Sequence, residues 1–294
     1  MKPIIARRLN LNKEGNRMNL LNINIPEGKS GKFQIKNQAF PPGHEFNLSS
    51  DRNKILGGQN RGAIVLDKPY IISSLSETGQ GVWMTNLPVE QAQHKEALIG
   101  FHGNVLVGGL GLGLAVTILS ANKRVRSVTV VEKSRDVIDL VWEHLNINRF
   151  KCEIVPLDLF EYLTDDNRVF LDFDFGFYDI WQSDSETTFF DTVVPLRKLS
   201  RNIVKDIRCW NENVMRGQLA FSLSGRVQAF IQGTVDEKLF FNKDDKWMKW
   251  TVPFFEWLDG DAPAGMDEED MLARIKDYAA NYGSEQWEKE WGEL

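Results

Sequence analysis

The chain has 294 residues, of which 42% are hydrophobic and 26% are charged, and its formal net charge is −6. This length and composition are ordinary for a globular protein and allow one large domain or one domain with appendages. They exclude a membrane-spanning chain, because no apolar run reaches the length of a span, and the negative charge argues against nucleic acid as a partner.

The residue types that usually bind metals are few. The two cysteines, Cys152 and Cys209, lie in unlike contexts, and the four histidines show no zinc spacing. We therefore expect no metal site, and we expect a reduced, cytoplasmic protein.

Charge is distributed unevenly between the two ends of the chain. Residues 1–60 carry 10 Lys and Arg against 4 Asp and Glu and show little periodicity, so we expect a basic, irregular arm with one short strand near Phe33. Residues 251–294 carry 12 Asp and Glu against 3 Lys and Arg. Opposite charges at the two ends can attract each other or another copy of the chain, which leaves a homo-oligomer open.

The next segment, residues 61–100, predicts a small β layer followed by a helix. Three short apolar runs separated by turn residues favour antiparallel strands: 62–66, 70–72 and 82–84. A helix should run over residues 88–98, because Pro88 suits a first helical turn and Glu90 complements its positive end.

Residues 104–132 form the most informative stretch. A buried strand is expected at 104–107, followed by a tight turn with glycine at 109, 111 and 113. A helix should begin at Leu114, and a second strand at 127–131 ends on the carboxylate of Glu132. A strand, glycine turn, helix and second strand followed by an acid make up the nucleotide-binding half of a doubly wound sheet.

The glycine spacing narrows the class of nucleotide. The run Gly109, Gly111 and Gly113 is G-x-G-x-G, whereas a dinucleotide fingerprint requires G-x-G-x-x-G. The run also lacks the Gly-Lys-Ser/Thr ending of a P-loop, which argues against a triphosphate site.

The stretch from Val105 to Gly113, Val-Leu-Val-Gly-Gly-Leu-Gly-Leu-Gly, resembles the first motif of class I S-adenosylmethionine (SAM) dependent methyltransferases. Within that superfamily it most resembles the spermidine-synthase-like branch, and the resemblance covers roughly residues 60–235. It implies SAM as cofactor, with Gly109, Gly111 and Gly113 receiving its amino-acid end. Glu132 would hold the ribose, since one carboxylate can accept two hydrogen bonds from neighbouring hydroxyls.

The third strand, 152–156, leads to the expected adenine site. In the family an acid beyond this strand accepts a hydrogen bond from the adenine amino group, which implies that role for Asp158 and places Leu159 against the ring. Asp158 is also a good N-cap for the helix that follows, and the two roles are compatible.

The acceptor side of the site is expected at the end of the fourth strand, which lies in 173–179. Asp179 matches the first acid of the Asp-Ser-Ser/Thr-Asp segment that aminopropyl-transferring members carry, but the place of the second acid belongs to Gln182. Leu112 likewise replaces an aspartate of the family's glycine run. Both departures argue against polyamine synthesis. The resemblance also implies a pocket position for His94 on the helix at 88–98.

The remaining chain is expected to complete the sheet and add an extension. A helix is predicted at 189–211, and three further strands should follow it: 218–223, 227–231 and 238–241. The resemblance implies that the last two of these strands form an antiparallel edge. Residues 244–294 hold five of the nine Trp and a helix at 267–281. Trp at this density needs burial, on the sheet domain or on a neighbouring subunit.

The sequence therefore predicts an α/β protein, with a doubly wound, Rossmann-like methyltransferase sheet, a small N-terminal β layer and a Trp-rich, partly helical C-terminal extension. The expected parts are a basic arm, the β layer with its linking helix, the SAM-binding domain and the acidic extension: 1–60, 61–100, 101–243 and 244–294.

The function implied by the resemblance is SAM-dependent methyl transfer to a small or peptidic acceptor. Asp179 would orient the acceptor or take its proton, with Gln182 and His94 as accessory residues. One alternative is an aminopropyltransferase that uses decarboxylated SAM, which predicts a strongly acidic acceptor cavity. Another is a non-catalytic SAM-fold subunit that binds or supports a partner.

Overall fold

The computed structural model describes residues 20–47, 63–164, 172–182, 184–234, 248–262 and 265–291. The chain divides into two compact units. Unit 1 contains the described residues up to Gln182 together with Leu199–Trp210, and unit 2 contains Ser183–Lys198 together with Asn211–Leu294. The chain thus passes from unit 1 to unit 2 after Gln182, back to unit 1 at Leu199, and again to unit 2 after Trp210.

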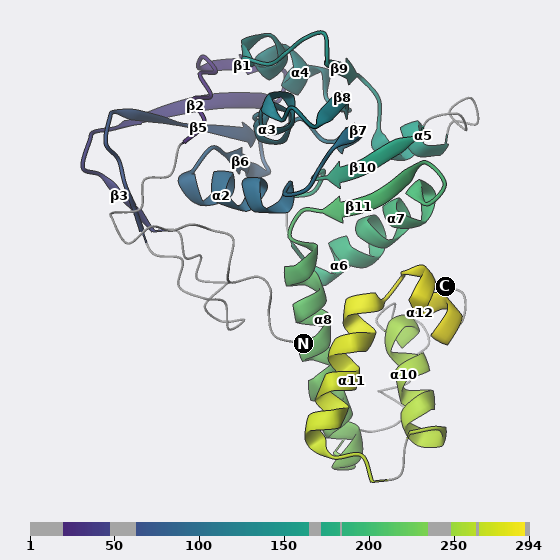
Figure 1. The fold of residues 1–294 in the computed structure, drawn as a ribbon. Helices are drawn as coiled ribbons and strands as arrows, with labels where there is room; N and C mark the ends of the chain where they lie inside the picture. The colour runs from purple at the N-terminus through teal and green to yellow at the C-terminus, as the bar shows by residue number, and fades with distance from the viewer. Residues whose placement is uncertain are drawn as a thin grey trace. The chain divides into compact units, whose positions relative to one another are not determined.

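A five-stranded sheet forms the centre of unit 1, in the order β11-β10-β7-β8-β9 (Figure 1). All four pairings are parallel. The strands are β7 (Gly103–Gly108), β8 (Val125–Val131), β9 (Cys152–Val155), β10 (Phe173–Tyr178) and β11 (Val204–Cys209). The strand order reverses between β7 and β10, so the ligand crevice of such a sheet is expected at their carboxyl ends.

Helices connect these strands as the sequence predicts. They are α2 (Pro88–Ala97), α3 (Leu114–Ala121), α4 (Arg135–Val141), which continues into the 3-10 turn η2 (Trp142–His144), and α5 (Leu159–Thr164). Helix α3 packs on β8 and against α2. The parallel, Rossmann-like sheet and the unit of strand, glycine turn, helix and strand over residues 104–132 are confirmed.

The second sheet of unit 1 is antiparallel, with the order β1-β2-β5-β6 (Figure 1). It contains β1 (Gly28–Ser30), β2 (Phe33–Phe40), β5 (Tyr70–Glu77) and β6 (Gly81–Thr85), and a separate pair joins β3 (Glu45–Asn47) to β4 (Ala63–Val65). The predicted β layer is confirmed but larger than expected. The expectation of an irregular arm is wrong over 28–47, where buried Phe33 and Ile35 alternate with polar residues.

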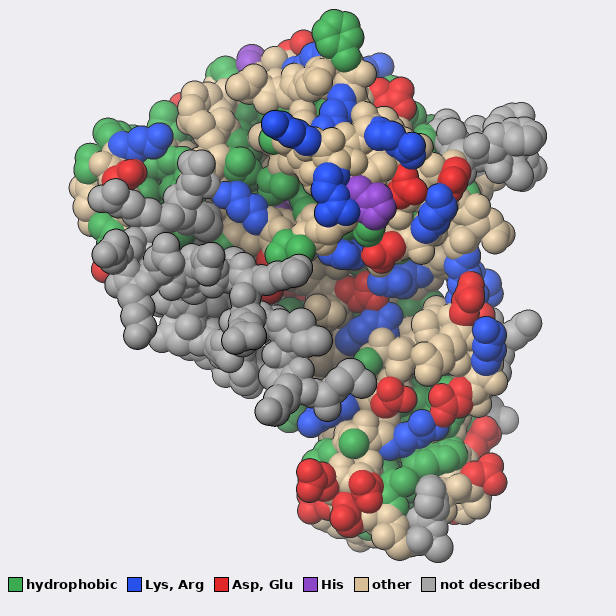
Figure 2. Space-filling view, viewed as in Figure 1, with side chains coloured by type: hydrophobic (Ala, Val, Ile, Leu, Met, Phe, Trp, Pro, Cys, Tyr) green, Lys and Arg blue, Asp and Glu red, His purple; other side chains and the backbone are tan. Residues whose placement is uncertain are grey.

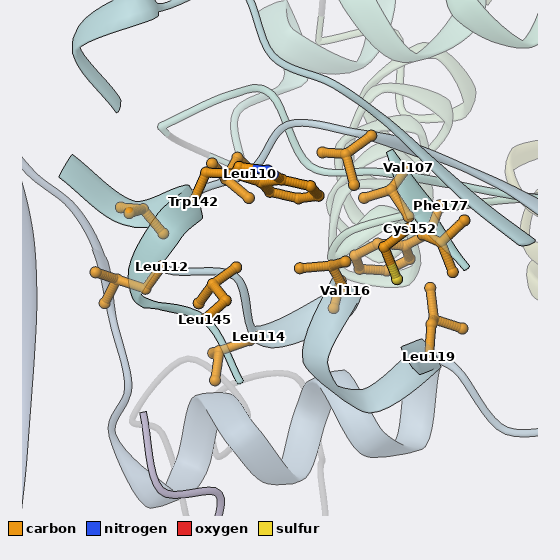
Figure 3. Close-up of a cluster of buried hydrophobic side chains, with 14 of the residues drawn as sticks. Val107, Leu110, Leu112, Leu114, Val116, Leu119, Trp142, Leu145, Cys152 and Phe177 are labelled. Carbon is orange, nitrogen blue, oxygen red and sulfur yellow. The ribbon is translucent and has the colours of Figure 1, made fainter. Parts of the chain in front are cut away.

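The core beneath the glycine turn is a cluster of buried aliphatic and aromatic side chains (Figure 3). Leu112 and Leu114 are fully buried in it. Gly113 is the N-cap of α3 with φ of 74°, and a Cβ there would overlap the side chain of Leu145. Leu112 is thus a core residue of this chain.

Unit 2 is helical. Its segments are α6 (Glu186–Thr188), the π-helical turn η4 (Phe189–Val193), α7 (Val194–Ser200, as far as Lys198), α8 (Glu212–Ile231), α10 (Met248–Gly260), α11 (Glu268–Asn281) and α12 (Glu285–Trp291). The predicted helix 267–281 is confirmed as α11, with Asp267 as its N-cap. Figure 2 shows acidic side chains gathered where α11 begins, in keeping with its acidic first turn.

Three predictions for this part of the chain are wrong. The helix expected at 189–211 ends at Ser200, and strand β11 follows it. The strands expected at 218–223 and 227–231 are one helix, α8, because Leu219, Leu223 and Val227 are buried at a spacing of four residues. The sheet edge at β11 is parallel rather than antiparallel. The strand expected at 238–241 lies outside the described residues.

The aromatic residues of the extension pack on one another within unit 2. Trp250 and Trp287 are almost fully buried, and both lie near Tyr278, with ring centroids 6.2 and 5.8 Å away. Trp291 stacks on Phe254 at 5.9 Å. The described helices include none with the length and apolarity that crossing a membrane requires.

Candidate functional site

A cavity of about 620 Å³ lies in unit 1 at the carboxyl edge of the parallel sheet. Residues that follow four strands line it: Gly109–Gly111 after β7, Glu132–Ser134 after β8, Pro156–Leu159 after β9 and Asp179–Trp181 after β10. Its volume falls within the roughly 300–1,000 Å³ of small-molecule sites. The cavity therefore occupies the crevice that the strand order predicts.

The glycine turn forms one wall, and its glycines at 109 and 111 have no space for a Cβ. Gly109 has φ of 91°, and a Cβ there would overlap the backbone oxygen of Asp179. Gly111 has φ of 52°, and its Cβ would overlap the sulfur of Met84. Both lie in the left-handed region, where glycine carries no steric penalty. Gly113 does not join them at the wall, because it lies behind the turn against Leu145.

Glu132 lies at the mouth of the turn and is held by the backbone. Its Oε2 accepts the N–H of Leu110 at 2.9 Å, and its Oε1 accepts the N–H of Ser134 at 2.8 Å. Burial raises the pKa of the Glu132 carboxyl, although these two hydrogen bonds oppose the shift. These bonds do not use all the lone pairs of the carboxylate, so it can still accept a hydrogen bond from a ligand in the cavity.

Asp158 and Leu159 lie together on the opposite wall. The Oδ1 of Asp158 accepts the N–H of Phe160 at 2.8 Å at the start of α5, so the capping role exists and engages one oxygen. Leu159 is 3% exposed, and its methyl group occupies the space where a Cβ at Gly108 would lie. Leu159 thus packs on the end of β7 and lines the cavity next to the carboxylate of Asp158.

Asp179 and His94 come together from distant parts of the chain. Asp179 follows β10, where its N–H bonds the backbone oxygen of Gly108 at 2.9 Å. His94 lies on α2, with Nε2 3.6 Å from Oδ2 of Asp179 and Nδ1 2.9 Å from the backbone oxygen of Glu90. Both side chains line the cavity, at the end where Gly109 contacts Asp179.

Gln182 is a predicted site residue that is not among those lining the cavity. Its side-chain amide donates to the backbone oxygens of Gln80 at 2.7 Å and Val82 at 3.2 Å, and the residue is exposed. It therefore joins the loop after β10 to the β5–β6 hairpin. Its contribution to the site is to hold that loop in place.

The β layer supplies a further wall of the cavity, which the sequence did not predict. Its lining residues are Lys32, Phe33, Leu75, Glu77, Trp83 and Met84. Glu77 accepts the indole N–H of Trp83 at 2.8 Å and pairs with Lys32 at 2.5 Å. Met84 accepts the N–H of Leu112 on its sulfur at 3.2 Å. These contacts depend on long-range strand pairing, and no local motif marks them.

No protein-family model matches the chain, and neither does any curated protein sequence. Among solved structures it is similar to the SAM-dependent methyltransferase from Agrobacterium tumefaciens (14% identity over 50% of this chain and 55% of that one, TM-score 0.34). It is also similar to TehB from Haemophilus influenzae (14% identity, 63% and 70%, TM-score 0.30) and to the plantazolicin methyltransferase BpumL in complex with SAH (11%, 69% and 58%, TM-score 0.29).

These matches are partial. The chain spans between 38% and 56% of the length of the first solved structures that it matches. The TM-scores are all below 0.5, so we infer the function below from the residues of this chain.

Proposed function

We propose that the chain is a SAM-dependent methyltransferase, related to the spermidine-synthase-like branch of class I, that methylates a small or peptidic acceptor. One observation carries the proposal. Glu132, which follows the second strand, presents a backbone-held carboxylate beside a glycine turn that admits no side chain, in a cavity of suitable size. A pair of ribose hydroxyls is the ligand group that this carboxylate fits.

The other lining residues fit the rest of SAM. Leu159 offers an apolar surface for the adenine ring, and Asp158 offers a carboxylate oxygen for its amino group. Gly109 and Gly111 let the backbone approach the amino-acid end closely. When bound, SAM would supply a methyl group activated by its positively charged sulfur.

Asp179 and His94 are the residues that would act on the acceptor. They lie at the end of the cavity beside Gly109, and Asp179 exposes a fifth of its side chain. Alignment of the nucleophile with the methyl carbon supplies much of the rate in such a reaction, and the protein need only orient the acceptor and manage its proton. Gln182 supports this arrangement through the loop that it anchors.

The aminopropyltransferase alternative is supported by one observation, the two carboxylates of Glu77 and Asp179 in one cavity. Against it, Leu112 is a core residue and Glu77 is already paired with Lys32.

Calorimetric titration of the purified protein with SAM, SAH, decarboxylated SAM and NAD separates these functions. We expect SAM and SAH to bind and NAD not to bind. A clear preference for decarboxylated SAM would replace methyl transfer by aminopropyl transfer. Binding of none of the four ligands would refute both enzymatic functions.

A further inference from the structure

The residues assigned to SAM line only part of the cavity. The glycine turn, Glu132 and the pair Asp158 and Leu159 follow β7, β8 and β9. Most of the remaining lining comes from the β layer and from Asp179–Trp181 after β10. With SAM bound to the first group, these remaining walls are the part of the cavity that is left for the acceptor.

A β-bulge in β6 turns two consecutive side chains toward the cavity. Strand β5 pairs Leu75 with Met84. The next pair is Ser76 with Val82, so Trp83 is an extra residue between the two pairs. Neighbouring side chains of a regular strand point to opposite faces, yet Trp83 and Met84 both line the cavity. Bulges re-aim side chains in this way beside binding sites, and this one adds an indole to the acceptor wall.

The ring of Trp83 is held in one orientation. Its indole N–H donates to Oε2 of Glu77 at 2.8 Å. The ring of Phe33 packs against it edge to face, with the centroids 6.4 Å apart and the planes at 60°. Phe33 is 6% exposed and belongs to the core, so it cannot move aside easily. Trp83 therefore offers a fixed apolar surface on which a second aromatic ring can pack.

The loop that carries Trp181 is tied to the bulge. Gln182 follows Trp181 and donates to the backbone oxygen of Val82, the residue before Trp83, at 3.2 Å. Both tryptophans line the cavity. The acceptor end thus receives aromatic surface from the β layer and from the loop after β10.

The carboxylates at this end of the cavity each face a basic group. Glu77 is 9% exposed, and its Oε1 pairs with the ammonium of Lys32 at 2.5 Å while its Oε2 accepts from Trp83. Asp179 faces Nε2 of His94 at 3.6 Å. Neither of these two described carboxylates is left to neutralise a cationic acceptor. An uncharged acceptor, which needs no counter-charge when it leaves water, fits these walls better.

We propose, resting on the function proposed above, that the bulged Trp83 recognises the acceptor and that the acceptor is an uncharged aromatic compound. Its ring packs on Trp83 in the part of the cavity that the β layer and Asp179–Trp181 line. The ion pair of Lys32 with Glu77 cancels the charge that would attract a cationic analogue.

Three probes of similar size test this class of acceptor: benzyl alcohol, benzylamine and cyclohexylmethanol. Each is titrated into the full chain saturated with SAH, and binding is followed by saturation-transfer NMR. We expect benzyl alcohol to bind about tenfold more tightly than cyclohexylmethanol, which lacks the aromatic ring, and than benzylamine, which carries a charge. Tighter binding of benzylamine, or equal binding of all three probes, would overturn the proposal.

Substitution of Trp83 distinguishes recognition from a structural role. Trp83→Leu should weaken benzyl alcohol about tenfold, whereas Trp83→Phe, which keeps an aromatic ring, should stay within about threefold of wild type. SAH binding, measured on each variant, shows whether the cofactor site is intact. Trp257→Leu is the control for aromatic binding elsewhere, because Trp257 lies in unit 2 and packs on Phe254. Unchanged benzyl alcohol binding in Trp83→Leu would contradict the proposal.

The ion pair gives the converse test. Lys32→Met leaves the Glu77 carboxylate without its cation, and the side chain of Lys32 is 63% exposed, so its replacement does not disturb the core. Benzylamine should then bind about tenfold more tightly than it binds wild type, with benzyl alcohol within about threefold. Lys36→Met is the control, since Lys36 is exposed on the same strand and is not among the lining residues. Equal benzylamine affinities in Lys32→Met and Lys36→Met would overturn the role of the pair.

SAH binding is measured first, because it separates this inference from the proposed function. If wild type binds no SAH, the proposed function fails. If SAH binds and none of the three probes does, the aromatic acceptor fails and the proposed function stands. Comparison of p-cresol with N-acetyltyrosinamide then tells a free aromatic compound from a tyrosine side chain of a peptide, and binding of either supports the class.

Discussion

At the scale of single residues, Gly109 shows the most severe requirement for glycine in the site. Its φ of 91° is costly for other residues, and the backbone of Asp179 occupies the space of a Cβ. Backbone cannot move away as a flexible side chain can. The turn therefore requires glycine both for its positive φ and for the close approach of the Asp179 backbone, and substitutions can distinguish the two effects.

We expect Gly109→Ala to destabilise the protein and abolish SAH binding, because both the strain and the overlap with Asp179 apply. Gly79→Ala is the matched control, since Gly79 has φ of 83° and nothing within 4 Å of its Cβ. Gly79→Ala should lower the free energy of unfolding by about 1–2 kcal/mol, through backbone strain alone, and should preserve SAH binding. Thermal unfolding and calorimetry measure both effects, and equal losses in the two variants would contradict the account.

Glu90 gives a prediction on pH. Burial raises the pKa of its carboxyl, against the opposing hydrogen bonds from Thr85. A raised folded-state pKa adds stability at pH values below the ordinary glutamate pKa and loses it as the pH rises through the raised value. Glu90→Gln should therefore flatten the decline of the free energy of unfolding between mildly acidic and neutral pH. Chemical denaturation at a series of pH values measures this slope, and an unchanged slope would contradict it.

The sequence could predict which residues meet at the cavity where each residue follows its own strand end. Gly109, Glu132, Asp158 and Asp179 each follow a predicted strand, and the shared carboxyl edge brings them to one cavity. The position of the Gln182 side chain could not be predicted, because it depends on contacts with the distant β5–β6 hairpin. The sequence placed His94 at the pocket only through the family resemblance, because nothing local shows that α2 brings it to Asp179.

Among the elements, α8 is one whose type was predicted wrongly, because two strands were expected within it. Its apolar segments are short enough to suit strands, and only the spacing of Leu219, Leu223 and Val227 separates a helix from two strands. Strand β2 shows the reverse case, because its Lys, Asn and Gln residues hide the alternation of Phe33 and Ile35. In both elements tertiary burial, and not local propensity, decided the structure.

The start of α8 also gives a prediction. Glu212 is 6% exposed and binds two arginines, Arg197 at 2.6 and 2.9 Å and Arg216 at 2.6 and 2.8 Å. Burial alone would raise the pKa of Glu212, but the charges of Arg216 and Arg197 outweigh it and lower the pKa. The stability that Glu212 adds is present above the ordinary glutamate pKa and is lost as the pH falls through the lowered value.

We expect Glu212→Gln to destabilise unit 2 by about 3 kcal/mol at neutral pH, because it leaves the arginines without their counter-charge. Asp277→Asn is the control within the same unit, since its ion pair with Arg274 is exposed and should be worth less than about 1 kcal/mol. The difference between the variants should shrink as the pH falls. Denaturant unfolding followed by circular dichroism measures it, and similar losses would contradict the prediction.

At the scale of the whole molecule, the path of the chain links the two units. Strand β11 belongs to unit 1, but in the sequence it comes between the two segments of unit 2. It pairs with β10 from Phe173 to Tyr178, and the Tyr178 hydroxyl bonds that of Ser200, in the same returning segment, at 2.8 Å. Truncation of the chain after Gln182 therefore leaves unit 1 without residues 199–210.

A chain ending at Gln182 should therefore fail to fold or should aggregate, since it lacks β11 and exposes the edge of β10 with buried Phe175 and Phe177. Adding Leu199–Trp210 back through a short linker should restore a soluble unit. Size-exclusion chromatography with circular dichroism decides between the outcomes. A monomeric, folded chain ending at Gln182 would contradict this view of unit 1.

Calorimetric titration of wild type and Glu132→Ala with SAH tests whether Glu132 and the glycine turn form a SAM site. We expect wild type to bind one SAH and the variant to lose about 10- to 100-fold in affinity, the effect of removing hydrogen bonds to a charged group. Glu132→Ala must remain folded by circular dichroism for the comparison to count. Equal binding of SAH by the two proteins, or no binding by wild type, would contradict the account.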